Sequence, residues 1–185
     1  MAEVINTNHK STTFTIENGI LKSYQWDRSN NVQIPSGVIE ISANVFNGRT
    51  QIKMVEIPEG VTKIGAYAFK GCTALAKVKL PSTLKTISRY AFDGCGCLNK
   101  VVLPTNLEKI EEMAFRGCWS MDNLVIPDKV TDIGDWAFSG CYGINKITLG
   151  RSLKHIGTNA FEFCTGVQEV TNKSAFDIKI GRAHV

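Results

Sequence analysis

The sequence lacks the features of several large protein classes. No stretch approaches the roughly eighteen apolar residues that a membrane-spanning helix needs. The N-terminal segment "MAEVINTNHKSTTF" is polar and has no apolar core, so no secretory signal peptide is predicted. The formal net charge is only +4 and no run of five like charges occurs, so neither a nucleic-acid-binding tail nor an acidic tail is indicated. We therefore expect a soluble, cytoplasmic protein.

Catalytic and cofactor-binding motifs are also missing. The sequence has no G-x-S-x-G, no H-E-x-x-H and no G-x-x-x-x-G-K-[ST]. The segment "GCGCLNK" at 94–100 begins like a dinucleotide-binding loop but lacks its third glycine. Glu111 and Glu112 are neighbours in a predicted turn, where we expect them to be solvated rather than catalytic. We predict no enzymatic activity, no cofactor, no metal site and no nucleic-acid partner.

Proline is scarce, and its positions show a regular interval. All five prolines are 23 residues apart: Pro35, Pro58, Pro81, Pro104 and Pro127. Two further residue types follow the same interval: Phe46, Phe69, Phe92, Phe115, Phe138 and Phe161, and Ile41, Ile64, Ile87, Ile110, Ile133 and Ile156. A last unit keeps the spacing but has Gly150 in place of proline and Phe163 in place of glycine. This pattern predicts a solenoid.

One unit, residues 75–98, indicates how each coil is built. Val78 and Leu80 alternate as in a short half-buried strand, which the proline of the repeat ends. A second short extended segment is expected around Ile87, on the far side of the coil. The segment "RYAF" at 89–92 is expected to form about one helical turn, which is too short to be stable alone. Each unit therefore depends on the coils stacked above and below it.

Five of the six cysteines occupy one position of the repeat: Cys72, Cys95, Cys118, Cys141 and Cys164. We interpret them as free, buried thiols that act as small hydrophobic side chains. A disulfide ladder is conceivable because stacked strands lie about 4.8 Å apart, but five equivalent positions cannot all pair. A zinc site needs clustered cysteine pairs with partner histidines, and the three histidines are scattered. Cys97 lies outside this column and is the predicted exposed thiol.

The two ends of the chain differ from the repeats. Residues 1–11 are expected to be a flexible N-terminus, 12–34 a hairpin cap with the first strand, 35–171 an array of about six units, and 172–185 a truncated tail. Asn18-Gly19 between alternating apolar residues predicts a type I′ hairpin turn that covers the first coil. Phe176 and Ile178 repeat the hairpin pattern of Phe14 and Ile16 and indicate a second, interrupted hairpin.

The last six residues, 180–185, belong to no repeat position. They match what a common short-read sequencing adapter encodes in one reading frame. Our hypothesis is that the natural sequence departs from this chain near Lys179 and that the parent protein continues further.

The unit L-x-x-V-x-L-P-x-x-L-x-x-I-x-x-x-A-F-x-G-C, read at 75–95, resembles the leucine-rich repeat of BspA-like bacterial proteins. The resemblance covers about residues 12–171. It implies a right-handed leucine-rich β-solenoid with a parallel sheet on the concave side and short helical turns on the convex side. It also implies a family associated with adhesion and protein binding, often at cell surfaces, although this chain shows no export signal or anchor.

We predict a protein ligand, one with acidic residues, on the outward positions of the concave strands: Lys53, Met54, Lys77, Lys79, Lys100, Val102, Asn123, Val125, Lys146 and Thr148. An ordinary solvated face explains the same residues. A lateral aromatic patch is a second candidate: Tyr67, Tyr90, Trp119, Trp136 and Tyr142. Stacking of aromatic rings between successive coils, with one edge exposed to solvent, is the favoured explanation of these residues. The functional hypothesis is a non-enzymatic protein-binding scaffold. The alternatives are an architectural spacer of a longer protein and a carbohydrate-binding or host-surface-binding adhesin module.

Overall fold

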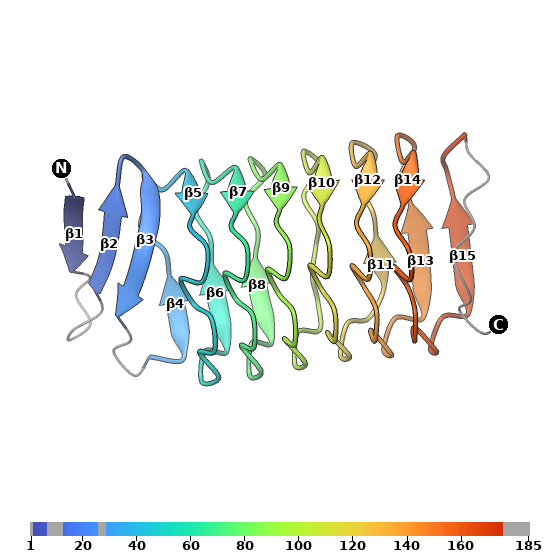
Figure 1. The fold of residues 1–185 in the computed structure, drawn as a ribbon, viewed down its shortest axis with the longest axis horizontal. Coiled ribbons are helices and arrows are strands. Elements are labelled where there is room, and N and C mark those ends of the chain that lie inside the picture. Colours follow the sequence, from blue (N-terminus) through green and yellow to red (C-terminus); the bar gives the residue numbers. More distant parts are fainter. Residues whose placement is uncertain (1, 7–12, 26–28, 176–185) are drawn as a thin grey trace.

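The computed structural model describes residues 2–6, 13–25 and 29–175 and shows a β-solenoid (Figure 1). Successive coils stack along the long axis, and most coils add one short strand to each of two sheets. The larger sheet, called the continuous sheet here, has the strand order β1-β2-β3-β5-β7-β9-β10-β12-β14. Its strands are β1 (Ala2–Asn6), β2 (Thr13–Glu17), β3 (Ile20–Gln25), β5 (Glu40–Ile41), β7 (Lys63–Ile64), β9 (Thr86–Ile87), β10 (Lys109–Ile110), β12 (Asp132–Ile133) and β14 (His155–Ile156).

The opposite sheet, called the split sheet here, consists of two separate parallel parts with the orders β4-β6-β8 and β11-β13-β15. Its strands are β4 (Asn31–Gln33), β6 (Met54–Glu56), β8 (Lys77–Lys79), β11 (Leu124–Val125), β13 (Lys146–Leu149) and β15 (Glu169–Asn172). The pairing places residues 23 apart side by side, as in Val55 with Val78 and Ile147 with Val170. The repeat therefore sets the register of both sheets, and the predicted solenoid with two extended segments per coil is confirmed.

The core is a set of columns that run along the solenoid axis. The six phenylalanines of the repeat stack face to face, with ring centroids 4.8–5.4 Å apart and ring planes within 7° of parallel. All six are buried. Fully burying a large apolar side chain stabilises a fold by about 1.5–3 kcal/mol, and in a solenoid each ring depends on its neighbours for that burial. A single coil could not bury this ring.

The cysteine column lies beside the phenylalanines and is buried as predicted, while Cys97 is exposed, and all six thiols are free. Each column thiol donates a hydrogen bond to the carbonyl oxygen of a phenylalanine in the preceding coil. The bonds are Cys72–Phe46, Cys95–Phe69, Cys118–Phe92, Cys141–Phe115 and Cys164–Phe138, at 3.1–3.2 Å. Cysteine therefore combines a small apolar volume with a weak hydrogen-bond donor. Alanine and valine have no such donor.

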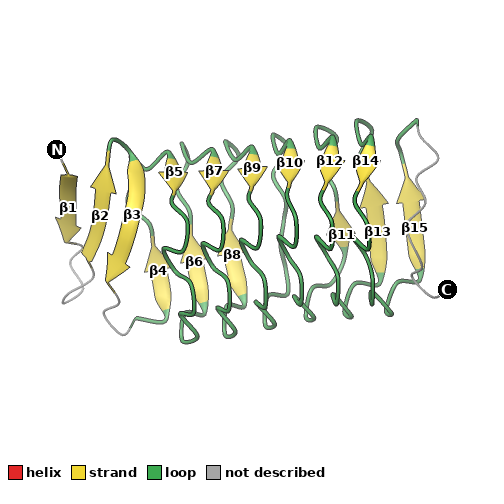
Figure 2. Ribbon diagram, viewed as in Figure 1, coloured by secondary structure: helices red, strands yellow, loops and turns green. Residues whose placement is uncertain are grey.

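The predicted helical turn at 89–92 is wrong, since the described residues contain strands, turns and loops but no helix (Figure 2). Tyr90 adopts a left-handed backbone with φ 58°, which interrupts any right-handed helical turn. The backbone N–H groups then alternate between two kinds of partner. Ala91 bonds within the turn to the Ser88 carbonyl at 3.2 Å, whereas Phe92 bonds to the next coil at Ala114, at 2.7 Å. The turns are thereby part of the coil-to-coil ladder.

The N-terminal cap is a hairpin, as predicted. Asn18 and Gly19 both have positive φ, 50° and 76°, as a type I′ turn requires. Strand β3 of this hairpin pairs in parallel with β5, so the cap extends the continuous sheet. Residues 2–6, which we expected to be part of a flexible segment, form β1 and pair with β2. The proposed second hairpin at Phe176 and Ile178 and the tail 180–185 lie outside the described residues.

Candidate binding surfaces

The ten predicted ligand-binding residues lie on the outer side of the split sheet and of the gap between its two parts. We call this surface the lysine–valine face. Eight of the ten side chains are exposed, and Met54 and Thr148 are half-buried. The strand positions of the repeat therefore place these residues on one accessible side of the solenoid.

The charges of this face are partly neutralised. Lys79 forms an ion pair with Glu56 of the preceding strand, and this hydrogen bond raises the pKa of the Lys79 ammonium. Lys146 pairs with Glu169 at 2.8 Å, which lowers the pKa of that carboxyl. Within the described part of the chain, Lys77 and Lys100 have no acidic partner. Lys53 has none there either, so the basic patch comprises Lys53, Lys77 and Lys100 rather than all the predicted lysines.

The split sheet is interrupted at the fourth coil, where residues 99–103 form no strand. The assignment of Lys100 and Val102 to a strand is therefore wrong. The side chain of Asn99 accepts the Lys100 N–H at 2.6 Å, whereas the equivalent N–H of Lys77 bonds to the preceding coil. A local side-chain bond of this kind competes with the β-ladder. Val102, within the interruption, is 80% exposed, and Val125, in the next coil, is 58% exposed.

The five predicted aromatic residues do not form one patch. Tyr67 and Tyr90 stack on each other, with ring centroids 4.8 Å apart, so the stacking alternative is confirmed for them. Trp136 is half-buried on the same column but is separated from Tyr90 by the coil that carries Met113. Trp119 and Tyr142 belong to a different turn of the coil and are exposed.

The tyrosine pair is surrounded by cations that also bind a carboxylate. Arg116 holds the buried Asp93 through two hydrogen bonds of 2.8 and 3.1 Å, and these bonds raise the pKa of the Arg116 guanidinium. Lys70 approaches Asp93 at 3.4 Å and lies 5.2 Å from the centroid of the Tyr90 ring. Because these groups satisfy one another, the cluster is best explained as packing between coils.

The sequence analysis missed a column of left-handed residues. Six successive coils carry a residue with φ between 53° and 64° just before the Ala–Phe pair: Asn44, Tyr67, Tyr90, Met113, Trp136 and Asn159. The terminal members are asparagines, the residue type that tolerates this conformation best after glycine. Those two asparagines were the sequence signal for a left-handed backbone at this repeat position. The large residues between them hold a conformation that sterically costs about 1–2 kcal/mol each.

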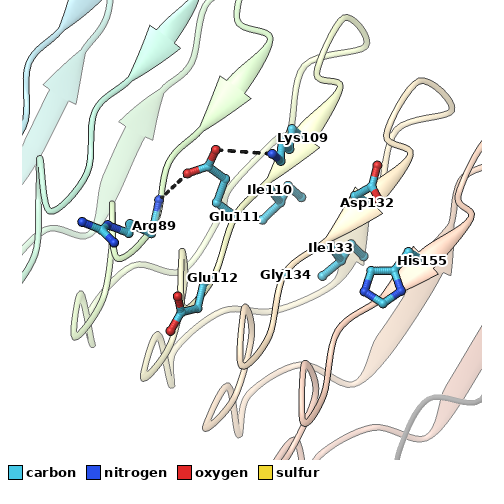
Figure 3. A pocket seen from close by; sticks show the side chains of 9 residues that line it. All are labelled: Arg89, Lys109, Ile110, Glu111, Glu112, Asp132, Ile133, Gly134 and His155. Atoms are coloured by element: carbon cyan, nitrogen blue, oxygen red, sulfur yellow. Dashed lines mark hydrogen bonds and ion pairs between the residues drawn. The ribbon is translucent and has the colours of Figure 1, made fainter.

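A shallow groove on the continuous sheet was also missed (Figure 3). It has a volume of about 340 Å³ and lies over β10, β12 and β14. Gly134 forms part of its floor, where a Cβ atom would lie only 2.4 Å from the Glu112 backbone nitrogen. Glu111 points toward Lys109 at 3.7 Å and also accepts the Arg89 N–H at 3.1 Å, so its charge is used within the protein. Gly134, at a repeat position where the two preceding coils have Ser88 and Glu111, was the signal for it.

No cluster of three or more metal-binding side chains exists among the described residues. In the same part of the chain, none of the secondary structure is a helix capable of crossing a bilayer.

Comparison with known families agrees with this geometry. Six copies of the BspA-type leucine-rich repeat region match residues 15–118 and 85–182. The chain belongs to the BspA-type leucine-rich repeat family. No curated protein has a sequence similar enough to count as a match.

Solved structures of bacterial leucine-rich repeat proteins show the same fold. A leucine-rich repeat protein of T. pallidum is 28% identical over 92% of this chain and 84% of its own, with a TM-score of 0.83. A leucine-rich cell surface protein of Faecalibacterium prausnitzii is 25% identical, with a TM-score of 0.72, and this chain covers 55% of its length. A leucine-rich repeat protein of Bacteroides ovatus, 24% identical over 98% of this chain and 58% of its own, has a TM-score of 0.64.

Proposed function

We propose that this chain is a non-enzymatic scaffold that binds an extended protein segment on the lysine–valine face. The observation that carries the proposal is the pair of exposed valines, Val102 and Val125, beside two lysines without acidic partners. Neighbouring exposed apolar side chains rimmed by polar residues are a common mark of a protein-interaction surface. The interruption of the split sheet also places them where the surface is least regular.

The chemistry of the face defines the ligand. Lys77 and Lys100 are 23 residues apart and occupy equivalent positions in successive coils, so their like charges repel each other. An acidic side chain between them would remove this repulsion. The two valines follow the same spacing and would contact apolar side chains of the same segment. We therefore propose a ligand in which acidic and apolar residues are close together, bound at moderate affinity and weakened by salt.

The test is a selection of random peptides displayed on phage against the immobilised chain. Enriched peptides should combine acidic and apolar residues, and their dissociation constants should rise with salt concentration. The double variant Lys77→Glu, Lys100→Glu should bind the enriched peptides at least about tenfold more weakly, and Val102→Ser should also weaken them. These side chains are exposed, so all variants should unfold within about 0.5 kcal/mol of the parent.

A matched control makes the same charge change elsewhere. Lys22 and Lys154 are exposed and lie outside the lysine–valine face, so Lys22→Glu, Lys154→Glu should bind the selected peptides like the parent. If the control variant lost as much peptide affinity as the double variant of the lysine–valine face, net charge alone would attract the peptides. If no peptide is enriched, or if the enriched peptides ignore the double variant, the proposal is wrong and an architectural role becomes the better account.

A further inference from the structure

Three exposed aromatic rings lie on consecutive coils at the turn that precedes the split sheet. Trp119, Tyr142 and Phe163 are 53%, 51% and 56% exposed. Trp119 and Tyr142 occupy the same repeat position, and Phe163 lies two positions earlier in the next coil. We call these three residues the aromatic edge. In the described part of the chain, none of the three has a ring or cation stacked on it, in contrast to Tyr67 and Tyr90.

The Trp119 ring lies flat on the preceding coil. A Cβ atom built on Gly96 would be 2.2, 2.4 and 2.8 Å from three adjacent ring atoms, Cζ2, Cε2 and Cη2. If the added Cβ atom lay in the plane of the indole beside Cζ2, it would be considerably farther from Cε2 and Cη2 than these distances. The three short distances therefore mean that a face of the indole covers Gly96. One face of the Trp119 indole thus packs on the backbone of Gly96, while about half of the residue remains exposed. The glycine is needed for this arrangement, since any side chain there would displace the indole.

Phe163 is held at an energetic cost. Its φ is 61°, a left-handed conformation that bulky residues rarely adopt. The five preceding coils all have glycine at the same position: Gly48, Gly71, Gly94, Gly117 and Gly140. Because the ring is exposed, little burial offsets the strain. The repeat imposes this left-handed backbone, so the unusual feature is that a bulky, exposed side chain replaces glycine there. Local strain of this kind is common at functional sites.

The surroundings of the rings restrict the kind of ligand. The three turn segments 117–120, 140–143 and 163–166 contain no charged residue and no aliphatic residue with an exposed side chain. Hydroxyl groups of Ser120, Tyr142 and Thr165 are the polar side chains available. A charged partner would find no counter-charge within these turns, and the flanking Arg116 is already paired with Asp93. A mainly apolar protein surface would find separated rings instead of a continuous patch.

We propose that the aromatic edge binds a neutral oligosaccharide. A pyranose has a C–H face that packs on an aromatic ring and hydroxyl groups at its rim that bond to uncharged polar groups. The coils repeat at about the 4.8 Å separation of neighbouring strands, so an extended saccharide could place successive units over successive coils. This surface is separate from the lysine–valine face, so either proposal can fail alone.

The experiment uses defined neutral hexasaccharides of glucose, xylose, mannose and N-acetylglucosamine, with a sulfated hexasaccharide as the charged comparison. Binding is measured by calorimetry and by the change in tryptophan fluorescence. At least one neutral hexasaccharide should bind, with little dependence on salt. Trp119→Ala and Tyr142→Ala should each weaken the binding of this hexasaccharide about tenfold. The loss of an aromatic side chain that stacks on a nucleic-acid base has an effect of this size.

Two further variants test the geometry. Gly96→Ala should weaken binding by displacing the indole while Trp119 itself is retained. Phe163→Gly should weaken binding yet melt no lower than the parent, because it restores the residue found in the other coils. Trp136→Phe, which changes a tryptophan outside the aromatic edge, should bind like the parent, as should Lys77→Glu, Lys100→Glu.

Three results would overturn the assignment. The first is that no neutral hexasaccharide binds at millimolar concentration. The second is binding that Trp119→Ala leaves unchanged. The third is binding of the sulfated hexasaccharide alone, which would mean that the lysines of the chain, and not the rings, hold the ligand.

Discussion

Phe115 and Trp119 are four residues apart in one coil, and the repeat treats them differently. At the position of Phe115, six successive coils have phenylalanine, and every ring is buried in one stack. At the position of Trp119, the other coils have Thr50, Thr73, Gly96, Tyr142 and Thr165. The buried position must fit the same neighbours in every coil, so only one residue type serves. The exposed position has no such requirement, so its residue varies from coil to coil.

The largest effect on stability is expected from a substitution in the buried phenylalanine stack. Phe115→Ala removes a ring from the middle of the stack and leaves Phe92 and Phe138 without their shared neighbour. We expect a loss of about 3–5 kcal/mol in the free energy of unfolding, as for buried phenylalanines elsewhere. Urea denaturation followed by circular dichroism measures it. Val102→Ala is the control on the exposed side and should change stability by no more than about 0.5 kcal/mol. Equal effects of the two variants would contradict the stacked-core description.

A smaller effect concerns the buried cysteines at alkaline pH. Burial raises the pKa of the Cys72 thiol to about 12 and of Cys164 to about 11, and it raises the pKa values of Cys95, Cys118 and Cys141 well above the usual range. In the unfolded chain these thiols lose their protons near pH 9, while in the folded chain they keep them. The unfolded state thus binds fewer protons above this pH, and stability must fall as pH rises toward the folded values.

Each such thiol contributes a slope of about 1.4 kcal/mol per pH unit. Cys118→Ala should therefore be less stable than the parent at pH 8 but should lose stability more slowly between pH 9 and 11. The measurement is the free energy of unfolding of both proteins in reducing buffer across this range. Lysines and tyrosines titrate in both proteins and cancel in the difference. If the two curves remain parallel, the thiol is not held protonated by the fold.

The sequence predicted those parts of the fold that depend on one residue type at one spacing. The prolines, phenylalanines, isoleucines and cysteines predicted the solenoid, its register and the buried thiols, and Asn18-Gly19 predicted the hairpin cap. The helical turn failed because "RYAF" has no local sign that Tyr90 is left-handed. The strand at residues 99–103 failed because a single bond from the Asn99 side chain diverts the backbone. Both failures depend on contacts that periodicity does not record.

The candidate surfaces were predicted less completely. Strand alternation predicted which side chains of the lysine–valine face are exposed, but the ion pairs Lys79–Glu56 and Lys146–Glu169 depend on which coil each acid faces. Trp119 and Tyr142 were identified, whereas Phe163 was noted only as a departure from glycine. Its exposure and left-handed backbone give that departure a meaning that the sequence pattern alone could not supply.

Counting reactive thiols tests most directly whether the repeated positions are buried and the variable positions exposed. Cysteine occurs at both kinds of position. Five thiols lie in the buried column, and Cys97 is exposed. Native protein treated with excess thiol reagent should react rapidly at one site, identified as Cys97 by mass spectrometry, and at all six sites after denaturation. Cys97→Ser should abolish the rapid native reaction. Rapid native labelling of four or more cysteines would show that the column is open to solvent and would contradict the account.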